Sequence, residues 1–235
     1  MIVATVCWVV VVPLCLVLPP LTGCAGAALE AHAPDAAWAY DNVEVLPEAG
    51  DLGGVTLADA LSQRRSARAF TPTPLTVEQT SDLLWAAQGV TSSWGGRTAP
   101  SAGALYPLEI YVVTAESAWH YVPADHQVQV RATADARGAV VDAVGQDSAA
   151  LAPALFVITG TPARLVPKYL LHAQRYTVLE AGHAAQNLLL AAAGLGLGGV
   201  PIGAFDRAAV ASALGLATGE EPIYVIPVGV PDASR

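Results

Sequence analysis

The sequence predicts an α+β fold from the kinds of elements it contains and from their order. Three runs rich in β-branched and aromatic residues predict buried strands at residues 108–113, 154–159 and 223–226. A hairpin adds two further strands, at residues 119–123 and 127–131. Helical patterns lie before and between these strands without the strict alternation of strand and helix that builds a parallel α/β sheet.

Five helices are predicted from periodicity and end signals. The clearest begins with the capping box Thr76-Val77-Glu78-Gln79 and ends at Gly89. The longest runs from about Lys168 to Ala193, is closed by Gly194, and carries alanines that allow close helix packing. The other three span residues 57–64, residues 134–144, and the stretch from the cap Asp206 to Leu214.

Composition limits the classes of function. The 235 residues are 54% hydrophobic and 13% charged, which suits one domain with a sizeable core. A formal net charge of -9 argues against a nucleic-acid partner, because phosphate backbones bind positive surfaces. All three cysteines (Cys7, Cys15 and Cys24) lie near the N-terminus, so the folded part has no thiol nucleophile, disulfide or cysteine metal site.

The N-terminus predicts export. Residues 2–21 are almost wholly apolar but contain prolines, which favours a signal peptide over a membrane-spanning helix. Leu21-Thr22-Gly23-Cys24 resembles a bacterial lipobox, in which Cys24 carries a lipid after cleavage. We therefore expect a signal peptide with a lipobox at 1–24, a linker at 25–54, and one domain at 55–235, exported and tethered to the membrane.

Another interpretation of the N-terminus stays open. No lysine or arginine precedes Arg64, so the basic region that normally starts a signal peptide is missing. An uncleaved anchor helix would also fit the apolar run. A wrongly assigned start would instead give a cytoplasmic protein.

A cluster of positive charge, Arg64-Arg65-Ser66-Ala67-Arg68, follows the first helix of the domain. Thr71-Pro72-Thr73-Pro74 comes shortly after it and cannot continue a helix. Arginine offers a planar fork of donors that fits phosphate, and serine adds one more donor. Two interpretations stay open, a solvated basic patch and a phosphate clamp for a bound nucleotide.

Two loops of small residues are candidates for contact with a flat ligand. Residues 98–107 would let the backbone approach such a ligand closely, although an ordinary loop has the same pattern. Residues 198–206 combine glycines and Pro201 with a following helix N-terminus, which favours an anion.

Lys168-Tyr169 is a candidate proton acceptor. Lys168 is the only lysine among eleven basic residues. Burial lowers the pKa of a lysine and would let the pair accept a proton, whereas the alternative is a lysine at a helix start beside a core tyrosine. Glu180 and His183 stand three residues apart but lack the second pair that a di-iron site needs. No metal site is therefore predicted, and Glu180 fits a structural or hydrogen-bonding role.

In their order and spacing, the stretches from about Leu57 to Gly229 resemble the nitroreductase superfamily of FMN-dependent oxidoreductases. Within it they are most similar to the SagB/ThcOx-type dehydrogenases. The resemblance implies a mixed, mainly antiparallel central sheet flanked by helices, and a homodimer with FMN at the subunit interface. Arg64, Arg65, Ser66 and Arg68 resemble the motif that holds the FMN phosphate and ribityl chain.

The resemblance implies further flavin contacts. Pro100-Ser101-Ala102-Gly103-Ala104-Leu105 resembles the flavin-facing loop that the partner subunit contributes, and Gln146 falls where the family has a polar contact to the flavin ring. Pro201-Ile202-Gly203-Ala204 resembles the segment whose backbone donates toward flavin N5. Val230 stands where an arginine is frequent, and Arg235 could replace that phosphate contact.

In azoline-oxidising members a Lys-Tyr pair is the catalytic base, and Lys168-Tyr169 matches it. The resemblance implies that Tyr169, assisted by Lys168, removes a proton while FMN accepts a hydride. We therefore expect an FMN-dependent oxidoreductase that acts on a small molecule or a peptide. One alternative is an NAD(P)H-dependent reductase of nitro compounds or quinones. Another is a membrane-tethered flavin-binding protein without catalysis.

Overall fold

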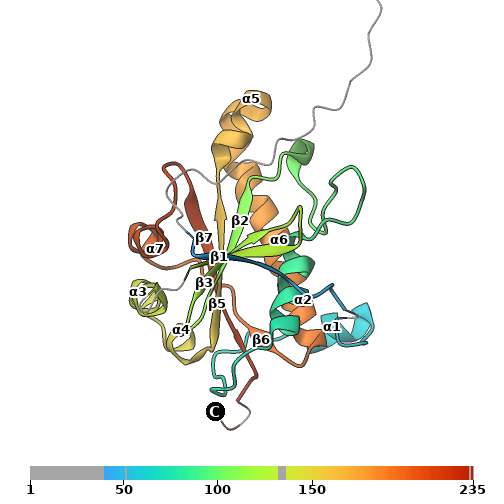
Figure 1. Ribbon diagram of the computed structural model, residues 1–235, viewed down its shortest axis with the longest axis vertical. Coiled ribbons are helices and arrows are strands. Elements are labelled where there is room, and N and C mark those ends of the chain that lie inside the picture. Colours follow the sequence, from blue (N-terminus) through green and yellow to red (C-terminus); the bar gives the residue numbers. More distant parts are fainter. Residues whose placement is uncertain (1–39, 51, 132–135, 233, 235) are drawn as a thin grey trace, which may run out of the picture. The chain divides into compact units, whose positions relative to one another are not determined.

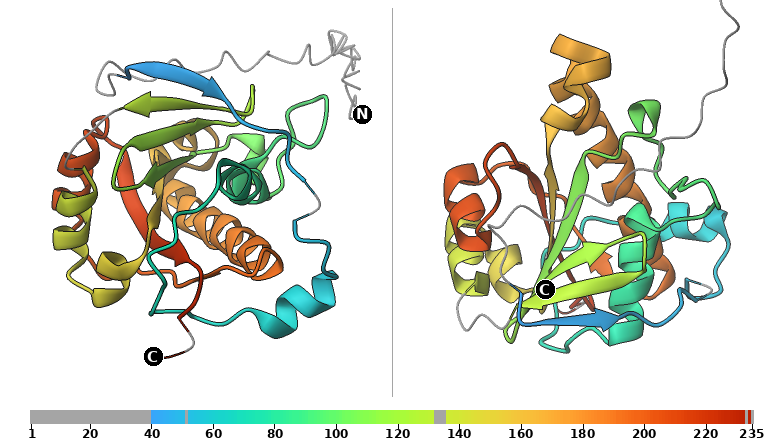
Figure 2. Two further views of the ribbon diagram at one scale, coloured as in Figure 1. Left: turned by 60° about the horizontal axis from the view of Figure 1, so that its bottom comes forward. Right: turned by 45° about the horizontal axis from the view of Figure 1, so that its top comes forward.

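The computed structural model describes residues 40–50, 52–131, 136–232 and 234, which build a seven-stranded sheet with helices on both faces (Figures 1 and 2). The strand order is β1-β4-β3-β2-β5-β7-β6, and the paired strands are antiparallel. The strands are β1 (Asn42–Val45), β2 (Leu108–Val113), β3 (Ala118–Val122), β4 (Gln127–Arg131), β5 (Ala154–Gly160), β6 (Gly198–Gly199) and β7 (Glu221–Gly229). This confirms the predicted α+β class and the predicted strands and hairpin.

Seven α-helices flank the sheet in the described part of the chain. They are α1 (Leu57–Gln63), α2 (Val77–Gln88), α3 (Ala136–Val144), α4 (Asp147–Leu151), α5 (Val166–Tyr169), α6 (Ala173–Gly194) and α7 (Arg207–Leu214). Alternate residues of the strands face two cores. Ile110 and Val112 of β2 pack in the core beneath α2 and α6, whereas Tyr111 and Val113 pack in the core beneath α3 and α7.

The predicted caps of α2 and α7 form the expected hydrogen bonds. The Thr76 side chain accepts from the Gln79 backbone amide, and the Gln79 side chain accepts from that of Thr76, so the capping box is complete. Asp206 caps α7 by accepting from the Ala209 amide, and Gly215 ends the helix in the left-handed conformation.

The edge strand β1 lies inside the stretch that the sequence predicted as a linker. Its residues pair with β4 from Asn42 opposite Val130 to Val45 opposite Gln127. All four of its side chains are exposed, so the strand carries no alternation of buried and exposed residues. It is held by backbone pairing, which leaves little signal in the sequence.

The prediction of one helix from Lys168 to Ala193 is wrong at its start. Helix α5 ends at Tyr169, a short 3-10 turn covers Leu170–His172, and α6 begins only at Ala173. Leu170 has φ 46° and ψ -120°, which no right-handed helix contains. Lys168 and Tyr169 therefore lie at the C-terminal end of a separate short helix, which stands at the top of Figure 1.

Some predictions lie outside the described residues. These are the signal peptide at 1–24 with Cys24, most of the linker, and the proposed phosphate ligand Arg235. Within the ranges that the structure describes, no helix is both long and apolar enough to cross a membrane.

The break at Leu170 can be tested by substitution. Leu170 is 70% exposed, so Leu170→Gly removes few contacts and relieves a conformation that only glycine adopts easily. We expect the free energy of unfolding to stay unchanged or to rise by up to about 1 kcal/mol. Leu179→Gly, at a half-exposed position inside α6, should lower it by about 1 kcal/mol. Equal losses in both variants, measured by denaturant unfolding, would instead support a continuous helix.

Candidate functional site

The arginine cluster lies on an extended segment that follows α1. Ser66 forms a parallel bridge with Gly199 of β6, and the Ala67 amide donates to the Gly199 carbonyl at 3.2 Å. Beyond β7, the Asp232 amide donates to the Ala69 carbonyl at 3.0 Å. Backbone hydrogen bonds to β6 and to the residues after β7 thus hold the segment. Its side chains are not needed for this pairing and can contact a ligand.

The arginine side chains carry charge without a counter-charge nearby. No ion pair joins Arg64, Arg65 or Arg68 to another residue of the described ranges. Arg65 donates to the carbonyls of Ser62 and Arg64, each at 2.8 Å, and Arg68 is exposed. Guanidinium groups in this state suit an anionic ligand better than a structural role.

The segment 201–204 and Gln146 meet beside this cluster. The backbone of Ile202 pairs with Val225 of β7 while its side chain is buried, so the neighbouring Gly203 and Ala204 stay at the surface. The Gln146 side-chain amide donates to the Ala204 carbonyl at 3.4 Å. Together with the bridge between Ser66 and Gly199, these contacts bring three of the predicted cofactor-binding elements together.

The turn at 100–105 and the pair Lys168-Tyr169 form a second group. Gly103 has φ 64°, and a Cβ atom added there would lie 2.7 Å from Lys168 Nζ and 2.9 Å from Tyr169 Oη. Both polar atoms therefore reach the backbone of the turn, and no side chain fits between them. The Lys168 side chain is exposed, so a single copy of the chain does not supply the burial that a proton-accepting lysine needs.

Helix α6 separates the two groups. Lys168 and Tyr169 precede its N-terminus, whereas Gly199, beside the arginine cluster, follows its C-terminus. A helix of 22 residues spans about 33 Å at 1.5 Å per residue. Figure 1 shows α5 at the top and β6 near the bottom of this helix. The predicted site residues of one chain therefore do not converge on one point.

A buried carboxyl group lies beneath the second group. Glu180 of α6 is 2% exposed, and neither of its oxygens makes a hydrogen bond of ordinary geometry. Burial raises the pKa of Glu180 to about 7, although the nearby Ser101 hydroxyl, Arg97 and the Gln88 amide partly oppose this. The sequence predicted a structural or hydrogen-bonding role for Glu180 rather than a metal site with His183, and His183 is exposed.

A polar network ties the segment before α5 to the sheet. Arg164 lies in the 3-10 turn Pro162–Arg164, donates to the Tyr106 carbonyl at 3.0 Å, and pairs with Glu109 of β2. His120 Nε2 lies 2.9 Å from Glu109. Burial disfavours both charged forms, but the hydrogen bonds and opposite charges together outweigh it. His120 and Arg164 lower the pKa of Glu109, and Glu109 with Gln129 raises the pKa of His120. The sequence did not indicate this network.

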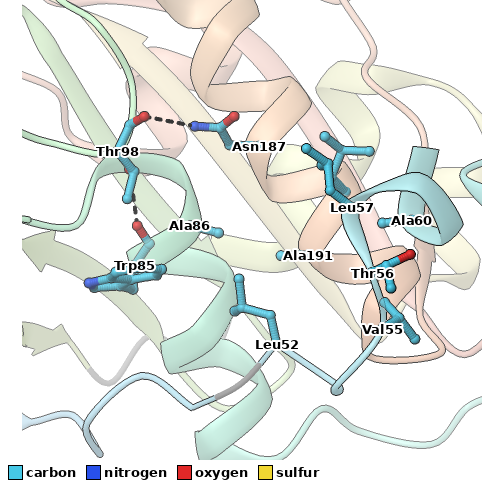
Figure 3. A pocket seen from close by; sticks show the side chains of 11 residues that line it. Leu52, Val55, Thr56, Leu57, Ala60, Trp85, Ala86, Thr98, Asn187 and Ala191 are labelled. Carbon is cyan, nitrogen blue, oxygen red and sulfur yellow. Dashed lines mark hydrogen bonds between the residues drawn. The ribbon is translucent and has the colours of Figure 1, made fainter.

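A largely apolar pocket of about 340 Å³ lies among α1, α2 and α6 (Figure 3). Asn187 donates to the Thr98 carbonyl at 3.3 Å across one wall, and the Thr98 hydroxyl donates to the Trp85 carbonyl at 3.2 Å. The other lining residues are Leu52, Val55, Thr56, Leu57, Ala60, Ala86, Leu190 and Ala191. None of the predicted cofactor or catalytic residues lines this pocket.

The raised pKa of Glu180 predicts how stability depends on pH. Between the usual value of 4.5 and about 7, the folded protein keeps a proton that the unfolded chain releases. The free energy of unfolding should therefore fall as the pH rises through this interval. Glu180→Gln, which cannot ionise, should be more stable than wild type by about 2–3 kcal/mol at high pH, with little difference at low pH. His183→Gln, three residues along the same helix, should show no such gain in denaturant unfolding at two pH values.

Comparison with known proteins identifies the family of the chain. The Nitroreductase family model matches residues 61–230. "Putative nitroreductase MJ1384" from Methanocaldococcus jannaschii is 38% identical over 187 residues, which cover 76% of this chain and 93% of that protein. The crystal structure of a putative nitroreductase from Ralstonia eutropha JMP134 is 33% identical, with a TM-score of 0.75 over 82% of this chain and 91% of its own.

A more distant structure shares the fold. The NADPH:FMN oxidoreductase from Vibrio harveyi, complexed with NAD+, is 24% identical and has a TM-score of 0.57 over 75% of this chain and 69% of its own. The family model covers most of the domain, from α1 to the end of β7, and the M. jannaschii relative is similar over nearly its whole length. The chain therefore belongs to the nitroreductase family.

Proposed function

We propose that this protein is an FMN-dependent oxidoreductase that transfers a hydride between the flavin and a small-molecule or peptide substrate. One observation carries the proposal: the arginines of 64–68, the segment 201–204 and the Gln146 amide lie together. These guanidinium groups have no ion pair among the described residues, and the chain belongs to the nitroreductase family. FMN offers matching parts: a phosphate, a flat ring face and a polar ring edge.

The residues present fit such a group. Arg64, Arg65, Ser66 and Arg68 would hold the phosphate and ribityl chain, because their donors have no anionic partner among the described residues. Gly203 has only one foreign atom within 4 Å of an added Cβ, Tyr224 Cε1 at 3.8 Å, so a planar ring can approach the backbone there. Gln146 would contact the polar edge of the ring.

We propose that the active unit is a homodimer in which each site takes residues from both copies. The pair Lys168-Tyr169 and the turn at 100–105 lie a helix length away from the arginine cluster of their own chain. They could therefore reach a flavin only if it were bound at the arginine cluster of a second copy. Large apolar side chains are exposed on α1, α6 and the turn after α5, as a surface covered by a partner would require: Leu57, Leu61, Leu171 and Val178.

Two kinds of substrate fit this site. In a SagB-type dehydrogenase, Tyr169 would accept a proton from the substrate with the help of Lys168, as in the oxidation of an azoline in a peptide. When bound, FMN supplies the hydride acceptor, which is chemistry that belongs to the cofactor. In a reductase, NAD(P)H would be the donor and a nitro compound or quinone the acceptor. The similarity to the nitroreductase relative of M. jannaschii favours this second candidate.

An absorption spectrum of the purified full-length protein tests the proposal. We expect flavin bands, or their appearance when FMN is added. Arg65→Ala with Arg68→Ala should weaken FMN binding on the order of 100-fold, because two charge-assisted contacts are lost. Arg131→Ala, at the end of β4 and near the edge of the sheet opposite β6, should not change the affinity. A colourless protein that does not bind added FMN would refute the proposal.

The same sample separates the candidate activities. Bleaching of the flavin by NADPH without oxygen supports the reductase. A flavin that NADPH does not bleach supports the dehydrogenase if a substrate bleaches it and if Tyr169→Phe slows that reaction. A flavoprotein that no donor reduces would be a binding protein without catalysis.

A heterodimer tests the shared site. One copy carries Arg65→Ala with Arg68→Ala, the other carries Gly103→Val, which would push on Lys168 and Tyr169, and two affinity tags allow the mixed dimer to be purified. Each homodimer should bind FMN weakly. A site built from both copies leaves one unaltered site in the mixed dimer, so one FMN should bind with wild-type affinity. No tight FMN in the mixed dimer would mean that each site lies within one chain.

A further inference from the structure

Glu180 and Gln88 leave polar atoms without partners in an otherwise well-paired region. Both residues are almost fully buried, and the Glu180 oxygens and Gln88 Nε2 make no hydrogen bond of ordinary geometry, although Ser101 and Gln88 lie close enough to lower the pKa of Glu180. The other end of the Gln88 amide accepts from Arg97 at 3.0 Å, so this side chain is fixed in place. An unpaired buried carboxyl group is costly, which makes a purely structural role a poor explanation.

Ser101 links this carboxyl group to the turn above it. The Ser101 oxygen accepts from the Tyr106 amide at 2.9 Å, which leaves its hydroxyl proton for an acceptor. Glu180 is such an acceptor, because the Ser101 hydroxyl is close enough to affect its titration. The turn needs this support, since Ala104 (φ 56°) and Tyr106 (φ 44°) both adopt a conformation that favours glycine.

The turn at 100–105 also contacts Lys168 and Tyr169. Their polar atoms lie against Gly103, two residues after Ser101, with no room for a side chain between them. A shift of the turn therefore moves the Gly103 backbone that contacts the Lys168 and Tyr169 side chains. The path from Glu180 to Lys168 therefore leads through Ser101 and Gly103.

We propose that Glu180 is a positioning residue whose ionisation draws the Ser101 hydroxyl toward it and so shifts the turn at 100–105 and the place of Lys168 and Tyr169. The ionised carboxylate needs donors, and the Ser101 hydroxyl and Gln88 Nε2 are two donors without other acceptors among the described residues. The neutral acid has no such need. The consequence for catalysis rests on the function proposed above, whereas the movement of the turn does not.

Several charged or titratable groups surround Glu180. Arg97, from the loop after α2, and Arg164, from the turn before α5, both favour its charged form. Tyr106 lies under the Arg97 guanidinium, 4.3 Å from its ring centre. On α6 itself the nearby titratable groups are Tyr176, four residues before Glu180, and the exposed His183, three residues after it. Burial of Glu180 outweighs the two arginines and brings its titration to about pH 7.

The single lysine of the chain makes the proposal testable. Labelling the full-length protein with 15N-lysine gives one backbone amide signal, that of Lys168. Without added flavin, this signal should move with pH in a step centred at about 7. The step should disappear in Glu180→Gln. In Ser101→Ala, which breaks the link but keeps the carboxyl group, the step should become smaller.

Two histidines serve as controls, because imidazoles also titrate near neutral pH. His172 lies four residues after Lys168, and His183 lies three residues after Glu180. The step should survive in His172→Gln and in His183→Gln. A step that persists in Glu180→Gln, or that is lost in either histidine variant, overturns the proposal, and so does a wild-type signal that does not move.

In the FMN-loaded enzyme, turnover by wild type should show the same midpoint in its pH profile, and Glu180→Gln should lack it. If the protein has no turnover, the function proposed above fails while the lysine signal still decides the role of Glu180. If turnover is present but the lysine signal does not move, the positioning role fails and the function stands.

Discussion

The packing of α6 against α2 and the sheet is the contact on which the rest of the structure depends. Ala181, Ala184 and Ala185 are buried on the side of the helix that faces the core shared with α2, and their small side chains let the helices approach closely. Burial along this face holds the helix against α2 and the sheet. It therefore fixes the distance between the residues before its start and those after its end, which are the two halves of the candidate site.

The two ends of α6 differ in their electrostatics. At the C-terminal end, arginines stand at the surface without an ion-pair partner among the described residues, on a backbone held by strand-like pairing. At the N-terminal end, the charged groups Glu109, Arg164 and Glu180 are wholly or largely buried, and they support a turn and a short helix. The first arrangement suits an anionic ligand. The second suits the positioning of Lys168 Nζ and Tyr169 Oη.

The sequence predicted those features that depend on local chemistry. The Thr76 capping box, the Asp206 cap and the buried strands follow from side chains and spacing, and each is confirmed. It missed β1, because an exposed edge strand has no hydrophobic pattern, and it ran α5 and α6 together, because Leu170 does not look like a helix breaker. For Glu180 it indicated only a structural or hydrogen-bonding role, since the raised pKa depends on burial and on Gln88 and Ser101, which are distant along the chain.

The arginine segment is joined to partners that lie very far along the chain. Ser66 and Ala67 bond to Gly199, Ala69 to Asp232, and Thr71 to Val230. Closing such long loops costs entropy before any contact repays it, so these pairings are expected among the last to form during folding. The anion-binding surface then exists only in a chain whose sheet is already complete. Occupancy by a phosphate-bearing cofactor would accordingly report on the completion of folding, and the cofactor would stabilise the contacts that form last.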